Sequence, residues 1–189
     1  MKLRLADCEL ELGYTAVAAM TAVLLTDREG RLIACLAAAM LHELGHLAMM
    51  KRLGVRIRAV RVRLFDVLIE ADACASFRSD VLVTLAGPAV NLCLAALLRR
   101  FSPEFALPQL VLGLFNLTPV MSFDGGRLLY LLLARRYAPA TCDAVLRITT
   151  FVFLLPLMTA GLVILFNNGY NYSFLAISLY LAALLLFRK

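Results

Sequence analysis

The stretch Leu41-His42-Glu43-Leu44-Gly45-His46 contains the only two histidines of this 189-residue chain. It lies inside an apolar segment, residues 32–53, that is long enough to cross a membrane as a helix. On a helix, residues four apart share one face, so both imidazoles can reach one metal ion. The carboxylate beside the first histidine can act as general base toward water. The pattern therefore predicts a Zn²⁺ site of His42 and His46 at membrane depth, with Glu43 as the catalytic residue.

The composition supports a membrane setting. Hydrophobic residues make up 62% of the chain and charged residues 17%, whereas soluble domains average about 45–50% and about 25%. The net charge of +6 comes from basic residues between apolar segments, which favours membrane orientation over nucleic-acid binding. The five cysteines show no C-x-x-C spacing, so no cysteine metal site or disulfide framework is expected. The expected surroundings are a lipid bilayer, with no nucleic acid partner.

Six apolar segments follow one another along the chain: residues 12–25, 32–53, 81–98, 107–121, 145–166 and 172–187. We therefore expect an all-α polytopic membrane protein with about six transmembrane helices, forming a single domain over residues 1–189. The fourth segment is short and interrupted by Pro119. Such segments line a protein interior or a cavity rather than lipid. No cleavable signal peptide is expected, since the first twelve residues lack an apolar core.

A small β-hairpin or sheet is expected between the second and third segments. Residues 55–64 alternate apolar and basic side chains for most of their length, which is typical of a strand, and residues 67–71 are a candidate hairpin partner. Two interpretations remain open. The sheet lies on the membrane surface with its arginines toward lipid phosphates, or the first strand is an edge that pairs with an extended substrate.

The distribution of Lys and Arg predicts the orientation. With six spans, both termini and the loops after the second and fourth spans lie on one side of the membrane. Only four of the nineteen basic residues fall on the other side: Arg28, Arg31, Arg99 and Arg100. Since cytoplasmic loops carry the excess of Lys and Arg, both termini are predicted to be cytoplasmic in a multi-pass protein of the bacterial cell membrane type.

A catalytic zinc site usually has a third protein ligand. Without a third histidine, the natural choice is a carboxylate, and the candidates near membrane depth are Asp66, Glu70, Asp72 and Asp124. Asp124 is the best placed, because it follows the broken fourth segment and precedes two glycines that allow close approach of backbone or substrate. Taken alone, Asp124 is better explained as the N-cap of a helix over residues 127–133.

Asn91 is a polar residue in an otherwise apolar segment. Its amide can bridge helices through hydrogen bonds, or it can orient a substrate carbonyl and stabilise an oxyanion. The residues alone leave both roles open. Asn116 gives a weaker signal of the same kind, for which helix bridging or a turn is the simpler interpretation.

Three motifs together resemble the signatures of the site-2 protease family of intramembrane zinc metalloproteases. They are residues 42–46, residues 86–88 with Asn91, and residues 116–119 leading into residues 123–127. Their order and spacing cover the expected catalytic core. The small size and six expected spans are most similar to the sporulation factor IVFB branch of bacterial members.

The resemblance implies a fold, a reaction and roles for two residues. Asp124 would be the third zinc ligand, and Asn91 would bind the substrate backbone. The substrate would be a membrane-embedded or membrane-associated regulatory protein, such as a pro-sigma or anti-sigma factor, and regulatory membrane partners would be expected. No PDZ or CBS domain is expected within the chain.

Two other classes of function are open to the same residues. A membrane metal-ion transporter could use the His and Asp cluster as a transit site, and a catalytically silent scaffold could keep the fold without the reaction. A transit site does not require Glu43 at its spacing, and transporters usually carry a chain of polar residues across the membrane. The presence of every expected catalytic residue favours hydrolysis over both.

Overall fold

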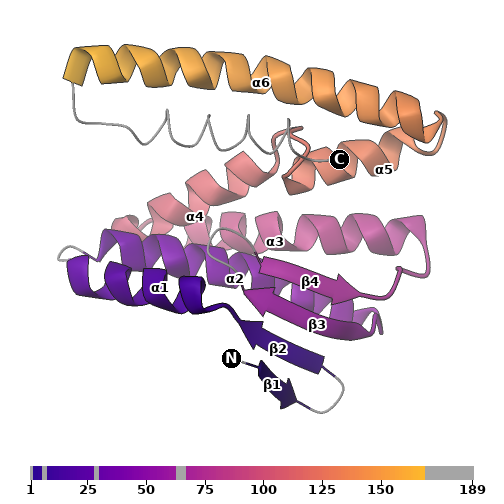
Figure 1. The fold of residues 1–189 in the computed structure, drawn as a ribbon, viewed down its shortest axis with the longest axis horizontal. Coiled ribbons are helices and arrows are strands. Elements are labelled where there is room, and N and C mark those ends of the chain that lie inside the picture. Colours follow the sequence, from indigo (N-terminus) through magenta and orange to yellow (C-terminus); the bar gives the residue numbers. More distant parts are fainter. Residues whose placement is uncertain (1, 6–7, 28–29, 63–66, 169–189) are drawn as a thin grey trace. The chain divides into compact units, whose positions relative to one another are not determined.

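The computed structural model describes residues 2–5, 8–27, 30–62 and 67–168, which form two compact units, Met1–Phe115 and Asn116–Lys189. The first unit holds four strands and three helices, with a fourth helix reaching the boundary (Figure 1). In chain order these are β1 Lys2–Leu5, β2 Cys8–Leu12, α1 Tyr14–Thr26, α2 Arg31–Arg52, β3 Ile57–Val62, β4 Val67–Ala71, α3 Phe77–Leu98 and α4 Pro103–Asn116. The second unit holds α5 Asp124–Leu133 and α6 Pro139–Asn168.

The fold is mostly helical with one small sheet, as the sequence predicts. Among the described residues, three helices are long and apolar enough to cross a membrane: Arg31–Arg52, Phe77–Leu98 and Pro139–Val163. The first and fourth apolar segments form α1 and α4, of 13 and 14 residues, which are short for a span of about 20 residues. The expected sixth span, residues 172–187, lies outside the described residues.

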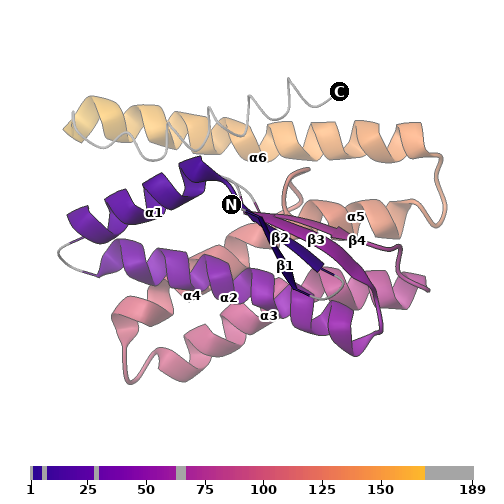
Figure 2. The ribbon, with the colours of Figure 1, turned by 60° about the horizontal axis from the view of Figure 1, so that its bottom comes forward.

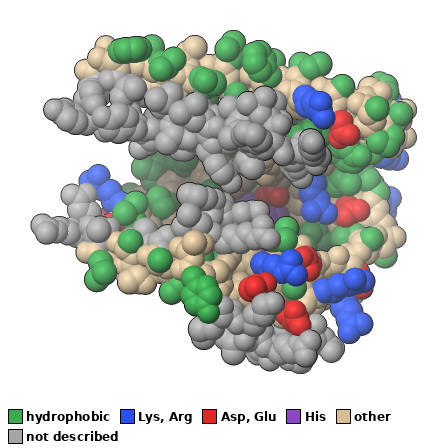
Figure 3. All heavy atoms as spheres, in the orientation of Figure 1, with side chains coloured by type: hydrophobic (Ala, Val, Ile, Leu, Met, Phe, Trp, Pro, Cys, Tyr) green, Lys and Arg blue, Asp and Glu red, His purple; other side chains and the backbone are tan. Residues whose placement is uncertain are grey.

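The apolar side chains that face outward suit lipid. Leu97 on α3, Val111 on α4 and Phe151 on α6 are 64%, 55% and 61% exposed. Figure 3 shows such hydrophobic side chains spread over the helices rather than confined to one spot. Extensive exposed apolar surface marks a contact such as that with a membrane. The protein is therefore suited to a membrane setting.

Helices α2 and α3 pack closely along their small residues, and α1 packs against α2 (Figures 1 and 2). The buried face of α2 repeats at helical spacing: Ala34, Ala38, His42, Gly45, His46 and Met50. A Cβ atom on Gly45 would lie 2.9 Å from the backbone oxygen of Ala86 on α3. Small residues allow helix backbones to approach in this way. The same face therefore brings both histidines against α3.

The sheet has the strand order β1-β2-β3-β4, and Figure 2 shows it nearly edge on as one layer. The predicted hairpin is confirmed, since β3 and β4 pair antiparallel with Val60 opposite Ile69. Strand β2 pairs with the other side of β3, in parallel, with Leu10 opposite Val60. The expectation that the strand of residues 55–64 is an edge is therefore wrong. Within the described sheet, β4 is the edge on that side.

The arginines of β3 have acidic partners on the neighbouring chain segments. Arg61 lies between Glu70 of β4, at 2.5 Å, and Glu11 of β2, at 3.3 Å. Arg58 pairs with Asp72, just beyond β4, at 2.5 Å. Charged side chains of both signs gather over the strands in Figure 3. These two arginines are thus neutralised within the sheet, rather than directed only at lipid phosphates.

In the second unit, helix α5 packs against α6. The turn before α5 is fixed to α6 by the backbone N–H of Met121, which donates to the Thr150 hydroxyl at 2.9 Å. Thr150 is buried and in turn donates to the backbone oxygen of Leu146 at 2.7 Å. Helix α6 includes Pro156, whose missing N–H is tolerated in membrane helices.

Candidate metal centre

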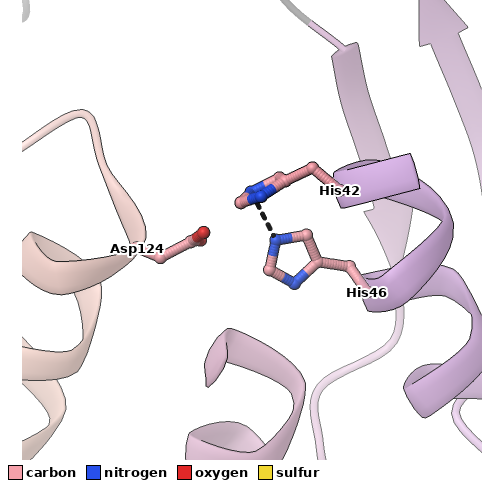
Figure 4. Close-up of side chains that lie close together, drawn as sticks. All are labelled: His42, His46 and Asp124. Atoms are coloured by element: carbon pink, nitrogen blue, oxygen red, sulfur yellow. Dashed lines mark hydrogen bonds between the residues drawn. The ribbon is translucent and has the colours of Figure 1, made fainter. Parts of the chain in front are cut away.

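His42 and His46 lie one turn apart on the buried face of α2, and their side chains are directed at one another (Figure 4). They are 5% and 8% exposed. Their Nε2 atoms are 3.1 Å apart, and the two rings meet edge to face with centroids separated by 4.8 Å. The predicted convergence of the two imidazoles is thus present in the structure.

The hydrogen bonds behind the rings determine which nitrogens carry protons. The Nδ1 atom of His42 lies 2.7 Å from Oδ1 of Asn91, and that of His46 lies 2.7 Å from the backbone oxygen of Val83. A carbonyl oxygen can only accept, so each Nδ1 is the donor. In a neutral imidazole with its proton on Nδ1, Nε2 carries the lone pair, and this is the form in which histidine binds a metal.

The distance between the Nε2 atoms fits Zn²⁺. Two nitrogen ligands at about 2.0–2.1 Å from a tetrahedral zinc ion are about 3.3 Å apart, close to the 3.1 Å found here. Gly87 of α3 keeps the space beside both nitrogens open. A Cβ atom there would lie 2.3 Å from Nε2 of His46 and 2.8 Å from Nε2 of His42. The donor set and the open space both suit a zinc ion.

Glu43 follows His42 on α2 and is half-buried, whereas the next residue, Leu44, is 53% exposed. Glu43 therefore lies at the side of the buried helix face that carries the histidines. The sequence predicts a general base at this position, and that role stays a prediction.

Asp124 is the first residue of α5 and is partly buried (Figure 4). The N-cap position belongs to Phe123, so the alternative in which Asp124 caps the helix is wrong. The two following glycines meet backbone, as expected: a Cβ atom would lie 2.2 Å from the oxygen of Leu117 at Gly125, and 2.1 Å from that of Val120 at Gly126. The close packing of this turn therefore fixes where the backbone of Asp124 lies in the second unit.

Asp124 also lines a pocket of about 440 Å³ within the second unit. Its other polar walls come from Arg127 and Tyr130 of α5 and Asp143 of α6.

Comparisons with known proteins agree with this site. A zinc metalloprotease of Methanocaldococcus jannaschii is 30% identical over 110 residues, which are 51% of this chain and 32% of that protein. The Mycobacterium tuberculosis protein Rip3, also named as a zinc metalloprotease, is 30% identical over 125 residues, 57% of this chain and 32% of Rip3. The chain thus covers about a third of the length of these curated relatives. No family model matches the chain.

A solved structure shares the fold. The structure of a site-2 protease from Methanocaldococcus jannaschii superposes with a TM-score of 0.70 at 22% identity, covering 96% of this chain and 91% of that one. The chain has the site-2 protease fold. The sequence relatives are named as zinc metalloproteases, and the structure comparison gives the fold. Both findings agree with the three motifs. The narrower assignment to the sporulation factor IVFB branch stays a prediction.

Within this site-2 protease fold, Asn91 is completely buried and bridges helices. Its Oδ1 accepts from His42, and its Nδ2 donates to the backbone oxygen of Ala38 on α2 at 3.1 Å and to Oε1 of Gln109 on α4 at 2.5 Å. The helix-bridging interpretation is confirmed, while binding of substrate by Asn91 stays a prediction. Gln109 was not singled out from the sequence, although it is the only polar residue in residues 105–115.

Proposed function

We propose that this chain is an intramembrane zinc metalloprotease, a metalloendopeptidase of the site-2 type. The observation that carries the proposal is the pair of histidine Nε2 atoms 3.1 Å apart, on an apolar helix that also holds Glu43. Ionisable side chains are costly to place at membrane depth. Two buried histidines whose Nε2 atoms converge there therefore indicate a function. The names of the two relatives support zinc as the metal and peptide hydrolysis as the reaction.

His42 and His46 would hold the ion, and we propose Asp124 as the third ligand. Its support is the Asp-Gly-Gly motif of the family resemblance and the rejection of its N-cap role. When bound, Zn²⁺ supplies a Lewis acid that polarises a carbonyl and lowers the pKa of water. Glu43 then takes a proton from the attacking water and returns it to the amine nitrogen of the departing peptide.

The substrate would be a membrane-embedded or membrane-associated protein, such as a pro-sigma or anti-sigma factor. A transmembrane helix shields its carbonyls within backbone hydrogen bonds, so the scissile region must unwind. Strand β4 offers the edge of the described sheet to such an extended segment, because β3 is paired on both sides. We propose that substrate adds along β4. A separate contact from Asn91 to the substrate would require its present partners to be exchanged.

We further propose about six membrane spans with both termini cytoplasmic. The three long apolar helices are consistent with this arrangement, and the unequal distribution of Lys and Arg supports the orientation. Because the histidines lie in the half of α2 nearer the basic turn at Lys51 and Arg52, water would reach the site from the cytoplasm.

The test is a Glu43→Gln variant of the purified chain compared with wild type. Its loss of cleavage with one zinc still bound per chain supports the proposal, because the variant keeps both histidines and removes only the base. Membrane proteomics of cells expressing each form identifies the substrate, which accumulates uncleaved with the variant and is then used in the purified assay. Full cleavage by Glu43→Gln would refute the base assignment. Zinc flux into proteoliposomes without any cleavage would favour the transporter instead.

A further inference from the structure

Two buried amides form a continuous hydrogen-bonded chain behind His42, which we call the amide relay: Asn91 of α3 and Gln109 of α4. The two residues are 0% and 3% exposed to solvent. Oδ1 of Asn91 accepts from Nδ1 of His42 at 2.7 Å, and its Nδ2 donates to Oε1 of Gln109 at 2.5 Å. The relay thus runs from the imidazole on α2, through α3, to α4.

The relay has a defined direction. Nδ2 of Asn91 donates to two acceptors, Oε1 of Gln109 and the backbone oxygen of Ala38. This leaves Oδ1 to face His42. If the Asn91 amide were turned over, its NH₂ group would meet the N–H of His42, and the imidazole would have to move its proton to Nε2. That tautomer has no lone pair at Nε2 for a metal.

The two histidines differ in what holds them. Nδ1 of His46 donates to a backbone oxygen, that of Val83, which the helix itself keeps in place. Nδ1 of His42 depends on a side chain whose orientation in turn depends on Gln109. Since the amides are buried among apolar helices, an unmade hydrogen bond cannot be replaced cheaply by one to water. The hydrogen bonds from Nδ1 of His42 therefore lead through Asn91 to α4, whereas the one from Nδ1 of His46 ends on the backbone of α3.

We propose that Gln109 is a positioning residue of the metal centre. It orients the Asn91 amide, and Asn91 holds His42 as the Nδ1–H tautomer with Nε2 directed at the ion. The partners of metal-bound histidines commonly set ring orientation and ligand basicity in this way. The proposal rests on the proposed function in taking Zn²⁺ as the ion at His42. It gives Asn91 a role distinct from substrate binding.

The test measures zinc affinity by competition with a chromogenic chelator, on the purified full chain, without substrate. Two matched pairs of variants distinguish the loss of the hydrogen-bond acceptor from a change in side-chain shape. They are Asn91→Asp with Asn91→Leu, and Gln109→Glu with Gln109→Met. The carboxylate variants keep an acceptor toward His42 or toward Asn91. We expect Asn91→Leu to lower zinc affinity by about 10–100-fold, and Gln109→Met to lower it toward the smaller end of that range. Asn91→Asp and Gln109→Glu should each recover most of the loss.

A buried hydroxyl on α3, the helix of Asn91, provides the control. Thr84 is 1% exposed, and its Oγ1 has no hydrogen-bond partner within the described part of the chain. Thr84→Val should keep wild-type zinc affinity. Co²⁺ absorption gives a second readout, since a displaced His42 weakens the intense d–d bands of a tetrahedral site. We expect the spectrum to change in Asn91→Leu and Gln109→Met, and to stay as in wild type in Thr84→Val.

The outcomes are separable. If wild type binds no zinc, the proposed function fails. If wild type binds zinc and both apolar variants bind it equally well, the relay proposal alone is overturned. Asn91→Asp binding no better than Asn91→Leu would also overturn it, because a role limited to bridging helices loses as much in either variant. If Asn91→Leu does not fold, as judged by circular dichroism, the Gln109 pair decides.

Discussion

The helix pair α2–α3 and the four-stranded sheet belong to the same unit but are held together in different ways. The helices meet through small residues, and the polar groups between them, His42, His46 and Asn91, are buried and hydrogen-bonded. The sheet instead carries ion pairs on its surface, with Arg61 and Arg58 side chains 35% and 70% exposed. A change in the helix pair should therefore reach the metal, while a change in the sheet should leave zinc affinity near that of wild type.

Gly87→Ala should have the largest effect. The added Cβ would lie 2.3 Å from Nε2 of His46, inside van der Waals contact and in the space a zinc ion needs. We expect zinc affinity to fall by at least about 100-fold, as for loss of an oriented ligand, and cleavage to fall with it. Zinc content after dialysis and circular dichroism check this. A folded Gly87→Ala chain with one firmly bound zinc would show that α3 does not confine the site.

Gly45→Ala should show how far the helix contact and the metal are coupled. Its Cβ would lie 2.9 Å from the backbone oxygen of Ala86 and 3.1 Å from Cγ2 of Val90. Because backbone cannot yield as a flexible side chain does, the helices must separate, at a cost of about 1–3 kcal/mol. We expect a lower unfolding midpoint in detergent and a weaker, measurable loss of zinc affinity than in Gly87→Ala. Ala48→Gly, on the exposed side of α2, is the control for an exchange between glycine and alanine on this helix.

How much the sequence reveals differs between the same two regions. The His42–His46 pairing follows from helical periodicity alone, since residues four apart must share a face. The open space at Gly87 is only hinted at by its motif, because the contact joins residues some forty positions apart. Gln109 shows why the rest was missed: one amide in an apolar helix gives no sign of its partner until the helices are packed.

The sheet was predictable only in its local part. The hairpin of β3 and β4 follows from alternation and proximity in sequence. Strands β1 and β2 also alternate, as in the order Glu9, Leu10, Glu11, Leu12 of β2, but each strand is so short that alternation is weak evidence. The parallel pairing of β2 with β3 crosses two intervening helices. Strand order, and hence the identity of the edge, depends on that long-range pairing.

The edge assignment can be tested with Leu68→Pro and Ile69→Pro in β4. Successive N–H groups of a strand point to opposite sides, so one proline removes a bond to β3 and the other removes a donor from the outer edge. The edge variant is the one whose proline removes the donor from the outer edge. We expect it to raise KM several-fold, in line with the loss of about one hydrogen bond, with kcat and zinc affinity near wild type. The other variant should lower the unfolding midpoint. Equal KM for wild type and both variants would exclude substrate addition along β4.

Arg61→Ala should have the smallest effect. It removes the link from β3 to Glu70 on one side and Glu11 on the other. Surface ion pairs of this exposure contribute about 0–1 kcal/mol and are screened by salt. We therefore expect a decrease of a few degrees at most in the unfolding midpoint at low salt, shrinking as salt is added, with unchanged zinc affinity. Because the two histidines lie on α2 and their hydrogen-bond partners on α3, a loss of zinc from Arg61→Ala would mean that the sheet and the helix pair form one cooperative element.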